Sequence, residues 1–266
     1  MKKITTILLL GTLFMACSKN LVTGRKQLKL VSETELQTMA NTEYITFLKS
    51  NSVVSSSDNR TEMVKRVGSK IASAIKKYYD LKGQNSVLAG YNWEFNLVES
   101  KEINAWCMPG GKVVVYTGLL AISETEAGLA VVLGHEITHA VAQHGSERMS
   151  QGLVQQLGGS ALQIALSGKP TETQNIFLTA YGVGTNVVAV LPYSRNAENE
   201  ADKYGLYFMA MAGYNPEVAI PFWERMEKAS GTSLPEFMST HPSDASRIAK
   251  IKINLPQAIT YYKLAR

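Results

Sequence analysis

The segment from His135 to His139, with the sequence His-Glu-Ile-Thr-His, contains two of the four histidines in this chain of 266 residues. Residues four apart on an α-helix lie on the same face, about 6 Å apart along the axis. Two imidazoles at this spacing can bind one zinc ion, and the carboxylate of Glu136 can face a water on that ion. The segment therefore predicts two zinc ligands and a general base for hydrolysis.

The residues around this segment predict the helix that it needs. The sequence Ser-Glu-Thr-Glu at 123–126 is a capping box that indicates a helix start. Apolar residues follow at helical spacing as far as Val141. Gly145 is a natural stop at the other end. Both histidines would therefore lie in the second half of a well-signalled helix.

A third zinc ligand must come from elsewhere, because a catalytic zinc usually has three protein ligands and one position for water. His144 is near in sequence, but it lies nine residues after His135, about 180° round the helix. It could join the site only at a break in the helix. The favoured interpretation of His144 is a partly exposed histidine at the helix end.

The acidic segment at 194–202 is the stronger candidate for the third ligand. Within it Glu198 and Asp202 lie four apart and share one helical face, whereas Glu200 points elsewhere. A carboxylate on the metal, with a second one a turn later, suits a ligand and a partner that hydrogen-bonds a ligand histidine. A solvated acidic helix face explains the same spacing equally well, so the residues alone leave both interpretations open.

Other local signals place the elements that surround this centre. A capping box predicts a helix over 32–50, and apolar residues at helical spacing predict a second one over 63–79. Alternating residues at 93–97, and short runs at 104–108 and 112–116, predict three strands. The chain should therefore be mainly α-helical (α+β), with one small β-sheet directly before the metal motif.

Two uncharged stretches, 149–168 and 173–194, are each long enough to span a membrane. Both contain several Gln, Asn, Thr and Gly residues, which lower their apolarity. The preferred interpretation is buried or membrane-facing helices of a soluble domain, with insertion into a membrane as the alternative. Further helices are expected at 194–211, 216–229 and 243–254.

The composition excludes one large class of function. The formal charge is +5, and without Lys2 and Lys3 it is +3, from 25 basic and 22 acidic residues. This excess is small, and no basic block interleaved with aromatic residues is present. Nucleic acid is therefore not an expected partner, while the 45% hydrophobic content allows a sizeable core.

The first residues resemble a bacterial lipoprotein signal. Lys2 and Lys3 precede an apolar run at 4–15, which is too short to span a bilayer comfortably and ends at Cys17. Cleavage before Cys17 and attachment of lipid to it are expected. The match is imperfect, since Phe14 stands where a leucine is usual, and an ordinary secretory signal is the alternative. With Cys17 lipidated, Cys107 could form no intramolecular disulfide and would be a small buried hydrophobe.

The motifs and their order resemble the gluzincin metallopeptidases of the CAAX prenyl protease type 1 and HtpX group, and among them the periplasmic lipoprotein branch. His-Glu-x-x-His at 135–139 is followed about sixty residues later by Glu-x-x-x-Asp at 198–202. The resemblance extends to 22–25, 104–111 and 181–205, and it covers nearly the whole mature chain. Cys107 stands where these proteins usually have a small or aliphatic residue, which leaves open a thiol effect near the site.

For the metal site, the resemblance implies that His135, His139 and Glu198 are the ligands of one Zn²⁺ per chain. It implies that Glu136 is the general base and that Asp202 supports a ligand from behind. In this scheme Glu136 takes a proton from the attacking water and then delivers it to the leaving amine.

For the substrate cleft, the resemblance implies that Asn104 and Ala105 lie on an edge strand that borders the active site. Such a strand would bind substrate backbone by strand addition. His241 would lie on a loop over the metal, where it could stabilise the oxyanion or cap the resting site as a fourth ligand. Arg247 matches a family arginine on the same segment, and the resemblance makes it and His241 further candidate catalytic residues.

The expected function is a zinc metalloendopeptidase of the bacterial cell envelope that degrades misfolded or misassembled proteins. The expected organisation is a signal peptide at 1–16, a tether and helix at 17–60, and the peptidase domain at 61–266. Lipid on Cys17 would anchor the chain, and the following Ser18 favours the outer membrane, facing the periplasm. The alternatives are a membrane-tethered assembly factor or chaperone that retains the zinc site, a zinc hydrolase of another substrate class, and a structural lipoprotein with a chance motif.

Overall fold

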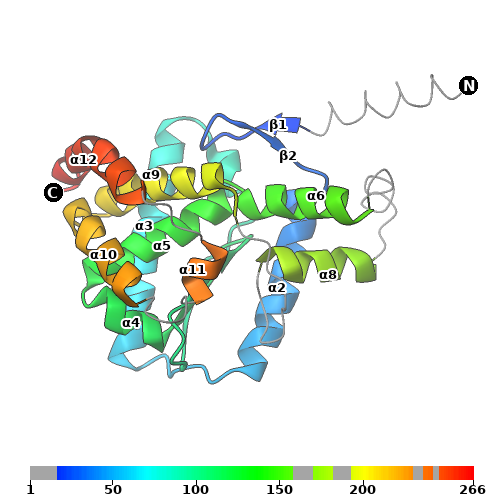
Figure 1. Cartoon of the computed structure of the whole chain (residues 1–266), viewed down its shortest axis with the longest axis horizontal. Coiled ribbons are helices and arrows are strands. Elements are labelled where there is room, and N and C mark those ends of the chain that lie inside the picture. Colours follow the sequence, from blue (N-terminus) through cyan, green and yellow to red (C-terminus); the bar gives the residue numbers. More distant parts are fainter. Residues whose placement is uncertain (1–16, 158–169, 182–192, 230–235, 242–245) are drawn as a thin grey trace, which may run out of the picture.

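The computed structural model describes residues 17–157, 170–181, 193–229, 236–241 and 246–266. Most of them form helices, and the strands form two small sheets (Figure 1), which confirms the predicted fold class. The strands are β1 (Cys17–Lys19), β2 (Lys26–Leu28), β3 (Glu94–Val98), β4 (Ala105–Met108) and β5 (Lys112–Tyr116). The α-helices are α2 (Glu33–Ser50), α3 (Asn59–Leu81), α4 (Thr117–Ser123), α5 (Glu126–Val141), α6 (His144–Leu157), α8 (Pro170–Tyr181), α9 (Arg195–Met211), α10 (Ala219–Ala229), α11 (Glu236–Thr240) and α12 (Arg247–Leu264).

The larger sheet has the strand order β3-β5-β4, with β3 parallel and β4 antiparallel to β5. The turn between β4 and β5 uses Gly110 and Gly111. Both have a positive φ, a conformation that is strained for residues with a side chain. No described strand pairs with the outer side of β4. Ala105 therefore lies on an edge strand, as predicted, and Asn104 directly precedes it.

This sheet has a hydrophobic core on each face, because successive side chains of a strand point to opposite faces. On β4, Ala105 and Cys107 belong to the core that includes α3, α5 and α9. Trp106 and Met108 belong to the other core, with α2, α6 and α8. Figure 1 shows α2 on one side of the sheet and α3 and α5 on the other.

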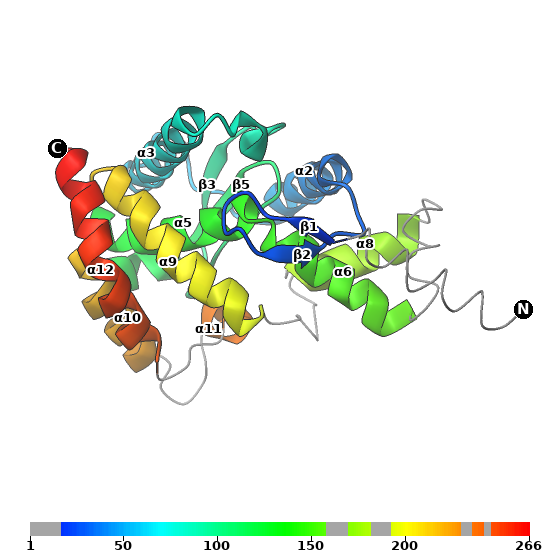
Figure 2. The ribbon, with the colours of Figure 1, turned by 90° about the horizontal axis from the view of Figure 1, so that it is seen from above.

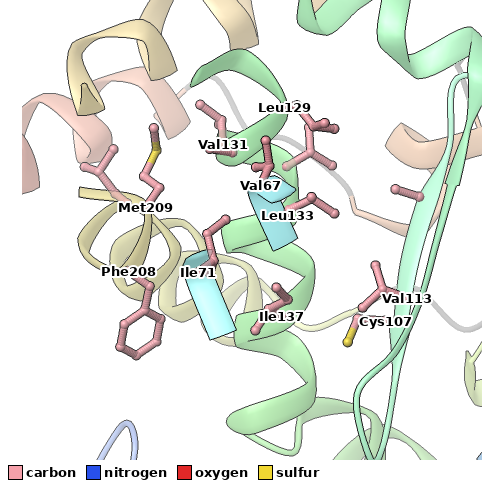
Figure 3. Packing of buried hydrophobic residues seen from close by; sticks show 14 of the residues in the cluster. Val67, Ile71, Cys107, Val113, Leu129, Val131, Leu133, Ile137, Phe208 and Met209 are labelled. Atoms are coloured by element: carbon pink, nitrogen blue, oxygen red, sulfur yellow. The ribbon is translucent and has the colours of Figure 1, made fainter. Parts of the chain in front are cut away.

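Helix α5 is the central element, and it carries the predicted metal motif. Figure 3 shows its residues Leu129, Leu133 and Ile137 between side chains of α3, α9 and the sheet. All three are fully buried. Burial of each such side chain stabilises the fold by roughly 1.5–3 kcal/mol, so this packing holds the helix firmly in place.

The ends of α5 differ from the predicted ones. Thr125, not Ser123, is the N-cap and accepts a hydrogen bond from the Gly128 amide, because α4 occupies the chain up to Ser123. The helix ends at Val141, before Gly145, which lies inside α6. A Cβ at Gly145 would lie 2.1 Å from the Tyr181 ring. This glycine therefore allows close packing rather than a helix stop.

Close backbone contact joins α5 to α9. A Cβ at Gly134 would lie 2.7 Å from the Gly205 carbonyl oxygen, and one at Gly205 would lie 2.8 Å from the Gly134 carbonyl carbon. Only glycine at both positions permits this approach. The contact brings the histidines of α5 next to the acidic side of α9.

The uncharged stretches overlap α6 and α8, which both begin before them, and residues 158–169 and 182–192 lie outside the described part. Among the described helices, none is by itself long and apolar enough to cross a membrane, and one sharply bent pair, α4 with α5, meets the same length and composition test.

The last helix, α12, continues through Pro256 to Leu264, beyond the predicted end at 254. The predicted start at 243 lies outside the described residues, and the domain boundary near residue 60 stays a prediction.

Candidate metal centre

Three elements bring four side chains together. Helix α5 supplies His135 and His139, α9 supplies Glu198, and His241 directly follows α11. One nitrogen or oxygen atom of each lies within 4.8 Å of the others. All four side chains are buried. The structure thus brings the three predicted zinc ligands together with His241.

The spacing of these atoms fits a zinc ion. His135 Nε2 lies 3.1 Å from His139 Nε2 and 3.5 Å from Glu198 Oε2. His139 Nε2 lies 3.3 Å from Glu198 Oε1. Ligands about 2.1 Å from a tetrahedral zinc ion lie about 3.4 Å from one another, and imidazole and carboxylate are typical zinc ligands.

The surroundings keep two of these groups in the protonation state that a metal requires. Burial lowers the pKa of His139 well below its ordinary value, so its ring is neutral and one nitrogen has a free lone pair. Burial by itself raises the pKa of Glu198, but the imidazoles of His241 and His135 hold it well below its usual range. Glu198 is therefore ionised.

Asp202 and Arg247 lie behind these groups. The Asp202 carboxylate is 2.9 Å from His135 Nδ1, and it favours the tautomer whose Nε2 lone pair faces the site. Arg247 donates to Asp202 at 2.8 Å and to Glu198 at 2.5 Å, while its guanidinium lies over the Trp223 ring. Arg247 does not line the cleft. Its contacts fit a residue that holds the two carboxylates in place, and its catalytic role stays a prediction.

Glu136 is the next residue along α5 and faces the cleft. Its Oε1 atom lies 3.4 Å from His241 Nε2 and makes no hydrogen bond. Burial raises the pKa of Glu136 to about 8, although the nearby His135 lowers it. A carboxyl group with a pKa near neutrality can both accept and return a proton during hydrolysis.

His241 lies over the other groups. Its Nδ1 atom is 3.3 Å from His135 Nε2 and 3.0 Å from Glu198 Oε1, and Phe237 stacks on its ring. Of the two predicted roles, this position matches a fourth ligand. The cleft beside it has about 20 Å³ of free space, roughly the room that one water needs. The described arrangement is therefore a closed one.

Strand β4 borders the cleft, as predicted. Asn104, Ala105 and Cys107 all line it, together with Glu136 and His241. Cys107 is free and buried, and burial, followed by the charge of Glu136, raises the pKa of its thiol well above the ordinary value. The interpretation of Cys107 as a small buried side chain is confirmed.

The interpretation of His144 as partly exposed is wrong. The helix breaks after Val141, where Gln143 has a φ of 54°, and His144 begins α6 as a buried residue. Its Nδ1 atom lies 3.0 Å from Nδ1 of His139, and its Nε2 atom lies 2.9 Å from Glu200. His144 therefore contacts the predicted ligand His139 on the side of its ring away from the metal centre, and it is not one of the four grouped side chains.

The sequence analysis assigned no role to Tyr193 or Arg148. The Tyr193 ring stacks on His139 with 4.0 Å between centroids, and the Arg148 guanidinium lies 3.6 Å from the Tyr193 centroid. Both side chains line the cleft. Tyr193 lies within the 181–205 stretch that carries the family resemblance, whereas Arg148 lies outside every such stretch, and the fold brings both to the site.

Comparisons with known proteins agree with this geometry. A model of Peptidase family M48 matches residues 59–254. The chain is 32% identical over 248 residues to "Metalloendopeptidase OMA1, mitochondrial" of Bos taurus, which covers 90% of this chain and 46% of that protein. It is 37% identical over 177 residues to "Mitochondrial metalloendopeptidase OMA1" of Arabidopsis thaliana, covering 66% and 34%.

A bacterial relative is similar over a shorter part. The chain is 31% identical over 173 residues to "Beta-barrel assembly-enhancing protease" of Escherichia coli, which covers 62% of this chain and 34% of that protein. The chain thus spans about a third to a half of the length of these relatives. The family match includes both the histidine pair of α5 and the acidic pair of α9, and the chain belongs to Peptidase family M48.

Proposed function

We propose that this chain is a zinc-dependent endopeptidase of the bacterial cell envelope that hydrolyses misfolded or misassembled proteins. The observation that carries the proposal is Glu136, a buried carboxyl group at the cleft, next to four groups whose spacing fits zinc. The edge strand β4 supports a peptide as substrate, because extended backbone can pair with it. The three relatives named above are called metalloendopeptidases or a protease.

In the proposed mechanism, His135, His139 and Glu198 would hold the zinc ion, which would supply a Lewis acid to polarise the scissile carbonyl and acidify water. Glu136 accepts the proton of the attacking water on its free Oε1 atom and then donates it to the leaving nitrogen. Asp202 fixes the His135 tautomer throughout. His241 must leave its described position before a peptide can enter, since the free space beside it is so small.

Metal removal tests the proposed activity. Purified protein with zinc should cleave unfolded casein, and a strong chelator should abolish the cleavage because the four groups cannot polarise a carbonyl by themselves. Addition of zinc should restore it. The readout is release of labelled peptides. Casein cleavage that survives complete removal of metal would contradict the proposal, and zinc binding without any cleavage would favour the assembly-factor alternative.

The proposed location rests on the first residues. The apolar run that ends at Cys17 supports a lipid anchor on that residue, and Ser18 supports the outer membrane. The name of the E. coli relative, which refers to β-barrel assembly, is consistent with an envelope role.

The location is tested with Cys17→Ala in a bacterial host. The wild-type protein should sediment with outer membranes, whereas the variant should lose most of its membrane association. The reason is that each CH₂ group of an acyl chain buried in the bilayer stabilises the bound state, and the variant has no acyl chains. Fractionation followed by immunoblotting gives the result. Equal membrane association of both proteins would rule out the lipid anchor.

A further inference from the structure

The N-terminal hairpin, formed by β1, β2 and the turn between them (residues 17–28), lies against the metal centre. Figure 2 shows it beside the junction of α5 and α6, with α9 nearby. Asn20 shapes its turn by accepting hydrogen bonds from the Val22 and Thr23 amides, and Gly24 adopts a φ of 76°. This turn places the Arg25 side chain toward α6 and α9.

Arg25 joins these two helices. Its guanidinium donates two hydrogen bonds to Glu147 on α6, at 2.7 and 2.6 Å. It donates two more to Glu200 on α9, at 2.9 and 3.2 Å. A planar guanidinium can orient two carboxylates in this way, whereas a lysine ammonium cannot. Arg25 therefore fixes the direction of the Glu200 carboxylate.

Glu200 passes this orientation to the metal centre through His144. Both carboxylate oxygens of Glu200 accept hydrogen bonds from the Arg25 guanidinium, so the group acts as an acceptor. His144 must then carry its proton on Nε2, 2.9 Å from Glu200. In the neutral ring, Nδ1 is an acceptor and faces Nδ1 of His139 at 3.0 Å. His139 consequently carries its proton on Nδ1, and its Nε2 lone pair faces the metal centre.

The same hairpin also holds the turn between the two histidines. The side chains of Asn20 and Gln27 donate to the carbonyl of Ala142, at 2.7 and 2.9 Å. Ala142 is the C-cap of α5, where carbonyl groups have no partner within the helix. Lys29, just after β2, bonds to the Gln143 side chain. The segment that links His139 to His144 is thus attached to the hairpin at several points.

We propose that Arg25 is a positioning residue for the zinc ligand His139, acting through Glu200 and His144. The inference rests on the proposed function in one respect only, the assignment of His139 as a zinc ligand. It explains why a side chain 114 positions earlier in the sequence lies beside the metal motif. It also gives the N-terminal hairpin a role in the site that the metal motif does not suggest.

The first test measures zinc affinity by competition with a coloured chelator, without substrate. Arg25→Ala should weaken zinc binding by up to about 10-fold, less than the 10- to 100-fold cost of losing a direct partner of a ligand histidine, because Arg25 acts through Glu200 and His144. Arg25→Lys should recover only part of the loss, because lysine cannot hold both carboxylates. The matched control is Arg66→Ala, which removes an arginine–glutamate pair at the other end of α5 and should leave the affinity unchanged.

The second test reads the tautomer of His139 in metal-free protein by nitrogen NMR. The wild type should carry the proton on Nδ1, and Arg25→Ala should give a mixture of both tautomers. Glu200→Gln should also weaken zinc binding. It serves as the test variant if Arg25→Ala does not fold. Wild-type zinc affinity in folded Arg25→Ala, an unchanged tautomer, or an equal loss in Arg66→Ala would overturn the proposal. Because neither readout uses peptide cleavage, a wild type that binds zinc but cleaves nothing defeats only the proposed function.

Discussion

Glu136→Gln is expected to lower peptide hydrolysis by about 10²- to 10⁴-fold while zinc content stays near one equivalent per chain. Glutamine has nearly the same shape, so the buried site beside His135 should remain intact. It cannot accept the proton of water, so the variant lacks the general base of the proposed mechanism. The measurement combines initial rates on labelled casein with metal analysis of the same samples.

Glu62→Gln is the control for this variant, because Glu62 is an exposed glutamate on α3 outside the site. Its rate and zinc content should equal those of the wild type. Cleavage by Glu136→Gln at the wild-type rate would remove Glu136 from the mechanism. Loss of zinc from Glu136→Gln would instead show that the carboxylate supports the metal.

Glu198→Gln should lose zinc, and activity with it. The amide oxygen is a much weaker ligand than the ionised carboxylate that His241 and His135 now stabilise. The fall in affinity should exceed the roughly 10- to 100-fold that loss of an outer partner costs. Chelator competition and zinc analysis after dialysis measure it, and circular dichroism of the metal-free protein shows whether the variant is folded.

A graded pair of variants makes this test specific. Asp202→Asn weakens the contacts with His135 Nδ1 and Arg247 but leaves the three ligands in place, so its loss of zinc affinity should be smaller than that of Glu198→Gln. Glu224→Gln, at an exposed position of α10, should have no effect. A folded Glu198→Gln protein that retains wild-type affinity would mean that another group is the third ligand.

Local signals predicted α5, α9 and β4, which carry most of the site, but not α11, which precedes His241. Ser194 caps α9 as its sequence indicates, and the strand pattern at 104–108 identified β4. The spacing of Glu198 and Asp202 placed them on one face, but spacing cannot show whether that face is solvated. The resemblance to a peptidase family was needed to prefer the metal, and the structure shows the Glu198 side chain to be buried.

Other features were not predictable from local sequence. The break before His144 depends on Gln143, a non-glycine residue in a left-handed conformation that no motif marks. The pair formed by Arg25 and Glu200 joins residues 175 positions apart. Such contacts depend on how α5, α6, α9 and the hairpin pack together, and this packing has no signature in a short segment.

The approach of Gly134 to Gly205 has a consequence for how this sequence can vary over evolutionary time. Main-chain atoms set the distance between α5 and α9, so it does not depend on the volume of neighbouring side chains. Exchanges of core residues that keep the packed volume should therefore change the distance between His135 and Glu198 little. Neither glycine has this freedom, because a methyl group on one helix would meet the backbone of the other.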